Sequence, residues 1–295
     1  MAYLKGRLGL DSARIPHVDR HGLLYMERGH VQVDFGTIRF VTAGFSDLAE
    51  GRYQIPHQTV SCLLLGPGTT ISQDALRILS AHGTALVAVG TDGVRVYSAP
   101  PLLPDTSDIA RRQVRSWADP ETRLMIARKM YAIRFGEILP HKDIDVLRGI
   151  EASRVKEGYR ALASRHGVRW EGRRYDRSNP SAADLPNQAI NHAATAVEAA
   201  ATVAVYAVGA LPQLGYIHEA SGASFILDVA DILRLEQTVT IAFRAVRAYE
   251  KDTAHSLDWH VRSIASQQFR RHAVIPTLID HIKRIFDVND CGGSD

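Results

Sequence analysis

The chain has 295 residues, 45% hydrophobic and 23% charged, which is typical of a folded globular protein of about two domains and unlike a disordered or fibrous one. The net charge of +3 identifies no partner by itself, and the two cysteines, Cys62 and Cys291, form no CxxC pair, which argues against a zinc module or disulfide scaffold and favours a reducing cytoplasm. Residues 1–8 lack the apolar core of a signal peptide, and the alanine-rich stretch 189–211 contains polar and charged residues, so we expect neither export nor a membrane span.

Residues 1–100 are expected to form a β-rich domain. Short segments rich in β-branched or aromatic residues alternate with glycine-containing turns, as strands do. The predicted strands are 23–26, 31–35, 37–41, 60–65, 85–89 and 94–97. One helix is expected over 72–82, because Ser72 can cap its start and Gly83 can end it.

A proline-rich connector at 99–105 is predicted to join this part to an all-α domain at 105–295. Apolar residues beyond the connector recur at helical spacing. The predicted helices are 121–135, 144–166, 188–209, 225–235, 239–249 and 257–272. The fold class expected is therefore α+β, with a β-rich N-terminal domain and an all-α C-terminal domain.

Positive charge is concentrated at the start of the helical part. Residues 109–174 contain sixteen Lys and Arg but only eight Asp and Glu. Such a basic segment in a nearly neutral protein favours a phosphate-binding surface. The alternative is a solvated, arginine-rich helix face.

Glu151 occupies an unexpected place in the helix predicted over 144–166. It continues an apolar stripe that includes Leu147 and Val155, so a carboxylate lies where a leucine would be expected. A buried carboxylate must be neutralised or bind a cation. The alternative is an ion pair with Arg148 or Arg154 on the same face.

Three further candidates lie close together in the sequence. Asp228 and Asp231 are three residues apart and share a helix face, and His218 lies in a glycine-bounded loop just before that helix. Two like charges so close repel unless a cation separates them. The alternative is that both carboxylates lie in the first turns and complement the helix dipole; for His218 it is an ordinary loop or core histidine.

Glu151, His218 and Asp231 together would form a site for Mg²⁺ or Mn²⁺, with the imidazole favouring Mn²⁺. Such a cation is expected to polarise a scissile phosphate and to lower the pKa of a bound water or 3′-hydroxyl. Asp228 is expected to orient a ligand, to be an optional ligand, or to accept the nucleophile's proton. With the basic segment, these residues favour a nucleic acid phosphodiester as substrate.

Arginines interleaved with aromatic residues near Trp170 suit phosphate contacts and base stacking, although a β-turn with a packed Trp has the same residues. Two more arginines are phosphate-contact candidates. The residues meant are Arg169, Arg173, Arg174, Tyr175, Arg234 and Arg262.

Several runs, in the same order along nearly the whole chain, resemble the CRISPR-associated integrase, the catalytic subunit of the spacer-acquisition complex in the form that accompanies Cascade. They are Asp19-Arg20, Gly66-Pro67-Gly68-Thr69, Gly93-Val94-Arg95-Val96-Tyr97, Arg128-Lys129-Met130-Tyr131, Arg134-Phe135-Gly136-Glu137, Leu147 to Val155, Gly172 to Asp176, Asn187-Gln188, Gly215 to His218 and Asp228 to Ile232.

The resemblance implies a β-rich domain for dimerisation and DNA-end contact, and a helical catalytic domain. It implies a homodimer, with dimers bridged by a small ferredoxin-like companion protein, that joins 3′-OH ends of short duplex DNA to a CRISPR repeat by metal-dependent transesterification. The family's metal ligands fall on Glu151, His218 and Asp231, and its accessory Asp on Asp228. Its basic positions fall on Arg95, Arg234 and Arg262.

Two departures from the family pattern stand out. Arg28 occupies the position where relatives have a tyrosine that stacks at the end of the captured duplex, so duplex ends are expected to be splayed differently. Some relatives have a proline-rich C-terminal tail, whereas this sequence ends at Asn289-Asp290-Cys291-Gly292-Gly293-Ser294-Asp295, so selection of the correct end is expected to differ.

Three functions remain open from the residues alone. The first is the integrase. The second is a metal-dependent endonuclease acting on branched or single-stranded DNA, with water as nucleophile. The third is a non-catalytic scaffold that wraps duplex DNA, whose affinity falls steeply with salt and needs no metal.

Overall fold

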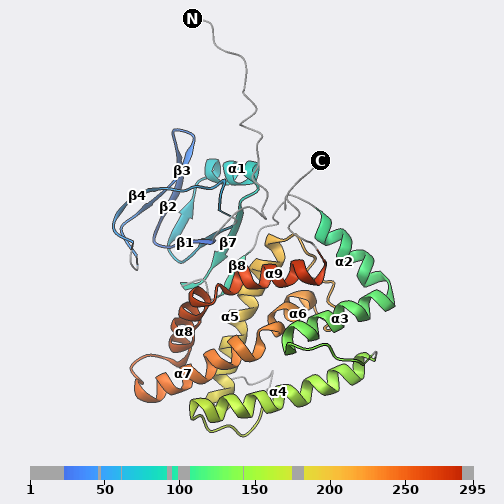
Figure 1. The fold of residues 1–295 in the computed structure, drawn as a ribbon. Helices are drawn as coiled ribbons and strands as arrows, with labels where there is room; N and C mark the ends of the chain where they lie inside the picture. Colours follow the sequence, from blue (N-terminus) through green and yellow to red (C-terminus); the bar gives the residue numbers. More distant parts are fainter. Residues whose placement is uncertain are drawn as a thin grey trace, which may run out of the picture.

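The computed structural model describes residues 23–45, 48–60, 62–91, 95–98, 107–141, 143–174 and 183–287. Strands occupy the N-terminal part and helices the C-terminal part, so the predicted α+β class is confirmed (Figure 1). The proline-rich connector predicted at 99–105 lies outside the described residues, as do 288–295.

The described strands form two four-stranded sheets. The first has the order β1 (Leu23–Met26), β5 (Cys62–Leu65), β7 (Ala85–Val89) and β8 (Val96–Ser98). Its first three strands are parallel, and β8 runs antiparallel to β7. The second has the order β4 (Gly51–Gln54), β3 (Thr37–Thr42), β2 (Gly29–Asp34) and β6 (Thr69–Ile71).

Two of these strands, β4 and β6, were not predicted. Both lie at the edges of the second sheet, where one side of the strand has no ladder partner and the apolar pattern is weak. The strand β4 contains Gly-Arg-Tyr-Gln and has no fully buried residue. The strand β6 is only three residues long, which is too short to show alternation.

The central strand β5 is buried on both of its faces. Leu63 and Leu65 pack into the core between the sheets, while Cys62 and Leu64 belong to the core of the helical part. Successive side chains of a strand point to opposite faces, so β5 is shared between the two cores. The β-rich and helical parts are therefore joined by continuous apolar packing.

The helix predicted over 72–82 is confirmed as α1 (Gln73–His82). The Ser72 side chain accepts a hydrogen bond from the Ala75 N–H, and Gly83 ends the helix in the left-handed conformation at φ 67°. Both features are the cap chemistry expected from the sequence.

The described residues from 107 onward are mainly helical. The helices are α2 (Asp108–Ala118), α3 (Pro120–Phe135), α4 (Ile144–His166), α5 (Leu185–Ala207), α6 (Ser224–Ile232), α7 (Thr240–Lys251), α8 (Leu257–Arg271) and α9 (Val274–Ile285). The helix predicted over 225–235 ends earlier, at Ile232, and the π-helical segment η5 (Arg234–Val239) leads directly into α7.

Two helices, α2 and α9, were not predicted. The buried face of α2 includes Gln113 and Ser116 beside Ile109, so it shows no apolar stripe. The helix α9 begins after Ala273, which has a positive φ of 45°, and carries Pro276 in its first turn, where proline is tolerated.

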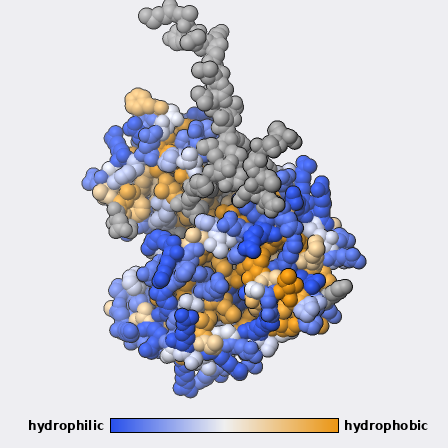
Figure 2. Space-filling model, viewed as in Figure 1, coloured by the Kyte–Doolittle hydropathy of each residue, from blue (hydrophilic) through white to orange (hydrophobic). Residues whose placement is uncertain are grey.

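The alanine-rich helix α5 runs through the middle of the helical part, between α7 and α8 on one side and α6 and α9 on the other (Figure 1). Most of its residues are buried, as expected for a packing helix. Within the described residues, no helix combines the length and apolar character needed to cross a bilayer. Figure 2 shows a mainly hydrophilic face, with hydrophobic residues gathered over the centre of the helical part.

Gly158 lets α4 approach the π-helical segment. A Cβ atom there would lie 2.6 Å from Leu235 Cδ1, whereas a Cβ at Gly149, on the same helix, would meet nothing within 4 Å. We expect Gly158→Val to lower the free energy of unfolding by about 1–3 kcal/mol through overpacking. Gly149→Val is the matched control and should be close to neutral in urea unfolding. Equal effects at both positions would contradict the packing assignment.

Candidate active site

Glu151 of α4 is held by two side chains from α3. Its Oε1 accepts a hydrogen bond from Arg134 Nη1 at 2.5 Å, and its Oε2 accepts one from the Tyr131 hydroxyl at 3.0 Å. Tyr131 and Arg134 are three residues apart, so they share the helix face that meets α4. Burial, reinforced by the charge of Glu151, raises the pKa of Tyr131.

Glu151 forms an ion pair, as the alternative interpretation holds, but with a different arginine. Arg148 instead contacts Asp145 and the Ile217 carbonyl, and Arg154 pairs with Glu137. Within the described residues, Glu151 pairs with Arg134 of α3 and with neither of these two arginines. The local pairing given as the alternative is therefore replaced by a contact between two helices.

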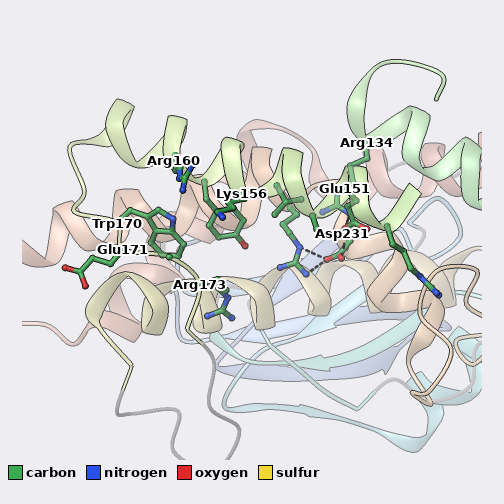
Figure 3. A pocket seen from close by; sticks show the side chains of 14 residues that line it. Arg134, Glu151, Lys156, Arg160, Trp170, Glu171, Arg173 and Asp231 are labelled. Carbon is green, nitrogen blue, oxygen red and sulfur yellow. Dashed lines mark hydrogen bonds and ion pairs between the residues drawn. The ribbon is translucent and has the colours of Figure 1, made fainter. Parts of the chain in front are cut away.

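Asp231, on α6, lies beside the same guanidinium. Its Oδ2 is 3.9 Å from Arg134 Nη1, and its Oδ1 accepts two hydrogen bonds from Arg234, the Nε–H bond being 2.9 Å. Arg134 thus bridges Glu151 and Asp231, which come from different helices (Figure 3). Arg234, predicted as a phosphate contact, is paired with the carboxylate one turn before it.

Asp228 fixes the loop that carries His218. Its side chain is fully buried, and Oδ2 accepts the N–H groups of Tyr216 at 2.6 Å and Ile217 at 3.1 Å. Oδ1 accepts the His218 N–H at 2.9 Å and approaches His218 Nδ1 at 2.7 Å. Because an ionised carboxylate only accepts, Nδ1 carries the proton, and Nε2 remains for another partner. Asp228 lies in the second turn of α6, so it is not one of the first-turn carboxylates that would complement the helix dipole.

The negative side chains of this cluster raise the pKa values of His218 and Glu198. The hydrogen bond to Asp228 raises the pKa of His218 against the opposing effect of burial, and the negative charges of Asp228, Asp231 and Glu151 act in the same direction as the bond. Glu198 of α5 also belongs to this neighbourhood. Burial raises its pKa, and the charge of Asp231 raises it further.

The residues fit a divalent cation in chemistry, although Arg134 lies between the two carboxylates. Among the described residues, no three His, Cys, Asp or Glu side chains are grouped closely enough to hold a metal as they stand. Glu151 and Asp231 nevertheless offer hard oxygen ligands, and His218 offers an imidazole nitrogen whose ring is oriented by a carboxylate. A cation could be held by these three residues once the guanidinium moves aside.

A cleft of about 800 Å³ extends from the carboxylates along α4. Glu151, Asp231 and Arg134 lie at one end, and Trp170 lies at the other (Figure 3). Its cationic lining residues outnumber the acidic ones by six to three, so the cleft suits an anionic ligand. The six are Arg134, Arg148, Lys156, Arg160, Arg173 and Arg234.

The arginines predicted near Trp170 have different surroundings. Arg173 lines the cleft and is held by the side-chain oxygens of Asn187 and Asn191. Arg169 and Arg174 are exposed and do not line the cleft, but both pair with Glu171, which does. The Trp170 ring packs on Tyr159 and Phe243, as the packed-Trp alternative expects. Tyr175 lies outside the described residues.

Arg95 and Arg262 lie apart from the cleft but close to each other. Arg95 Nη2 is 3.0 Å from Asp258 Oδ1, and Arg262 Nη1 is 3.1 Å from Asp258 Oδ2. His192 Nδ1 lies 3.4 Å from the same carboxylate. Arg28 belongs neither to the cleft nor to the group around Asp258. It is exposed in the turn between β1 and β2 and has a positive φ of 54°.

Sequence reasoning overlooked four residues of this site. The spacing of Tyr131 and Arg134 is compatible with a shared helix face, but no sequence pattern indicates that this face meets Glu151. Lys156 and Arg160 are four residues apart on α4, a spacing that could have revealed a basic row beside Glu151. Their exposure along the cleft became evident only from the fold.

Two carboxylates at the end of a basic cleft, with an imidazole whose pKa their charges raise, are typical of enzymes that cleave or join phosphodiesters. The chain belongs to the Cas1 family: the family profile described as "CRISPR associated protein Cas1" matches residues 24–139 and 132–261. The resemblance identified from the sequence is thereby confirmed.

Known relatives align over most of their length. The chain is 35% identical to "CRISPR-associated endonuclease Cas1" of Geobacter sulfurreducens over 90% of this chain and 85% of that protein. It is 34% identical to the protein of the same name from Escherichia coli K12, over 92% of this chain and 86% of that protein. A structure described as "Crystal structure of TtCas1-DNA complex" aligns with a TM-score of 0.80 and 30% identity, over 92% of this chain and 98% of that one.

The four contacts of Asp228 predict a large stability effect. An Asn side chain has one acceptor oxygen in place of two, so Asp228→Asn leaves buried N–H groups without an acceptor, at about 1–3 kcal/mol each. We expect the free energy of urea unfolding to fall by about 2–3 kcal/mol. His218→Ala keeps the backbone contacts and should lose less. If Asp228→Asn and His218→Ala had the same free energy of unfolding, Asp228 would not be the residue that holds this loop.

Proposed function

We propose that this chain is the metal-dependent DNA integrase of CRISPR adaptation, which joins the 3′-OH ends of short duplex DNA to a CRISPR repeat. The observation that carries the proposal is that Glu151 and Asp231 line one end of the basic cleft. A strand bound along such a cleft would have one phosphate beside Glu151 and Asp231. The DNA complex of a 30% identical Cas1 structure supports DNA as the ligand.

The basic side chains of the cleft position the strand. Lys156 and Arg160 are exposed on one face of α4, and Arg173 is fixed by two asparagines on α5. These three cations can contact successive phosphates without reading the bases. Holding the reacting groups in place supplies much of the rate acceleration in such reactions.

Glu151, His218 and Asp231 would hold Mg²⁺ or Mn²⁺. When bound, the cation stabilises the negative charge that develops on the scissile phosphate. Asp228 keeps His218 in one tautomer and orientation through its bond to Nδ1. It also keeps the loop at Tyr216 and Ile217 in place, so the imidazole needs little reorganisation before reaction.

The joining step conserves the number of phosphodiester bonds. The incoming 3′-oxygen forms a bond to the phosphorus of the repeat strand and loses its proton. The bond between that phosphorus and the repeat's own 3′-oxygen breaks, and the departing oxygen gains a proton. No external energy source is therefore needed.

The proposal includes an assembly. A homodimer, with a small ferredoxin-like companion bridging two dimers, would place two sites at the two ends of the captured duplex. The reaction would take place on the chromosome in the cytoplasm. Arg95 and Arg262, which converge on Asp258, are the candidate phosphate contacts outside the cleft.

A strand-joining assay tests this function. Labelled short duplex, a repeat-containing plasmid and Mn²⁺ or Mg²⁺ are incubated with the protein, with and without the companion. We expect label covalently joined to the plasmid, and none with Glu151→Ala or His218→Ala, whose metal-free DNA binding should remain largely intact. Joining at the wild-type rate by either variant would refute the metal-site assignment.

The same assay separates the alternatives. The relatives' name, "CRISPR-associated endonuclease Cas1", favours a nuclease as the second candidate, with water as nucleophile. Plasmid cut without joined label, even with the companion present, would support it. A DNA complex that forms without metal, changes no strand and tolerates Asp231→Asn would indicate a scaffold.

The basic row on α4 predicts a defined salt dependence. Each lost phosphate contact lowers the slope of log K against log salt by about 0.9 on duplex DNA, or about 0.7 on single strands. The double variant Lys156→Ala, Arg160→Ala should therefore reduce the slope by about 1.4–1.8 in fluorescence anisotropy titrations. Arg77→Ala, on the exposed surface of α1 and paired with Asp74, is the control. An unchanged slope in the double variant would exclude this row from the DNA interface.

A further inference from the structure

Arg134 is a buried cation whose hydrogen-bonding capacity is mostly unused. Only 5% of its side chain is exposed, and its Nε and Nη2 atoms are buried without a hydrogen-bond partner. Buried donors of this kind are normally satisfied, and leaving them unpaired is costly. The guanidinium is therefore held mainly by the negative charges of Glu151 and Asp231, and less by geometric complementarity.

Arg234 provides a comparison within the same site. It donates two hydrogen bonds to Asp231, through Nε and Nη2. Arg134 has one hydrogen bond, to Glu151, and a longer contact of 3.9 Å to Asp231. Of the two guanidinium groups, Arg134 is the one whose displacement loses fewer bonds.

The ion pairs around Arg134 set two negative charges against two positive ones. Glu151 and Asp231 contribute the negative charges, and Arg134 and Arg234 contribute the positive charges. A divalent cation added beside both arginines would leave an excess of positive charge in a half-buried region, which is unfavourable. That excess would be relieved by withdrawal of Arg134 together with entry of a phosphate.

We propose that Arg134 occupies the place of the divalent cation in the DNA-free protein and moves to the substrate phosphate when cation and DNA bind together. The site then takes up the cation weakly until DNA is present. Because such coupling is reciprocal, the cation must also strengthen DNA binding. This inference rests on the proposed metal site, and it makes Arg134 a positioning residue that links the two ligands.

The test measures Mn²⁺ binding to the full-length protein by isothermal titration calorimetry. We expect Arg134→Met to bind Mn²⁺ about tenfold more tightly than wild type in the absence of DNA, which corresponds to about 1.4 kcal/mol. A short duplex with 3′-deoxy ends, which cannot be joined, should tighten Mn²⁺ binding by the wild type. The same duplex should tighten Mn²⁺ binding by the Arg134→Met variant much less.

Two controls isolate the effect. Arg154→Met removes another guanidinium that stacks on the same ring, Phe135, but pairs with Glu137, and its Mn²⁺ affinity should equal that of the wild type. Glu151→Gln removes a proposed ligand and should abolish binding. If Arg134→Met does not fold, Arg134→Lys takes its place, because lysine keeps the charge without the planar fork. Its Mn²⁺ affinity should lie between that of the wild type and that expected for Arg134→Met.

The outcomes separate this inference from the proposed function. If Glu151→Gln abolishes Mn²⁺ binding but neither Arg134 variant binds more tightly than wild type, the metal site stands and the role of Arg134 is refuted. If Glu151→Gln binds Mn²⁺ as well as wild type, the metal site is wrong and this inference falls with it. A duplex that tightens Mn²⁺ binding equally in wild type and Arg134→Met would also refute the coupling.

Discussion

The burial of α5 is the constraint on which the helical part depends. Its buried positions are mostly alanine and valine, and small side chains let neighbouring helices approach closely. The helices α6, α7, α8 and α9 and the π-helical segment all contact it. The same helix also reaches the site, since Asn187 and Asn191 hold Arg173 and Glu198 lies within the electrostatic range of Asp231. Packing and chemistry thus share one element.

Elements with a strong local signal were predictable, and elements stabilised mainly by their neighbours were not. The first helix has a Ser cap and a terminal glycine, and the strands at 85–89 and 23–26 have short apolar or aromatic sequences. The edge strand β4 has little apolar character, and α2 buries Gln113 and Ser116. Gln113 is satisfied by backbone groups of Leu211 and Leu214, about a hundred residues away, so no local pattern could indicate its burial.

The site was predictable in its acidic and imidazole residues but not in their partners. Glu151 interrupts an apolar stripe, which is a local signal, whereas its contact with Arg134 depends on how α3 meets α4. The spacing of Asp228 and Asp231 predicted a shared face, yet the two serve different groups. Asp228 accepts bonds from the His218 loop, while Asp231 faces guanidinium groups. Loop closure over ten residues cannot be inferred from helical periodicity.

The sharing of β5 between two cores has a consequence for folding. Leu63 and Leu65 face one core, while Cys62 and Leu64 face the other, so loss of this strand would expose apolar surface in both parts of the molecule at once. We therefore expect the two parts to unfold together as one cooperative unit. A helical fragment lacking the first sheet would present an uncovered apolar face to water and be prone to associate.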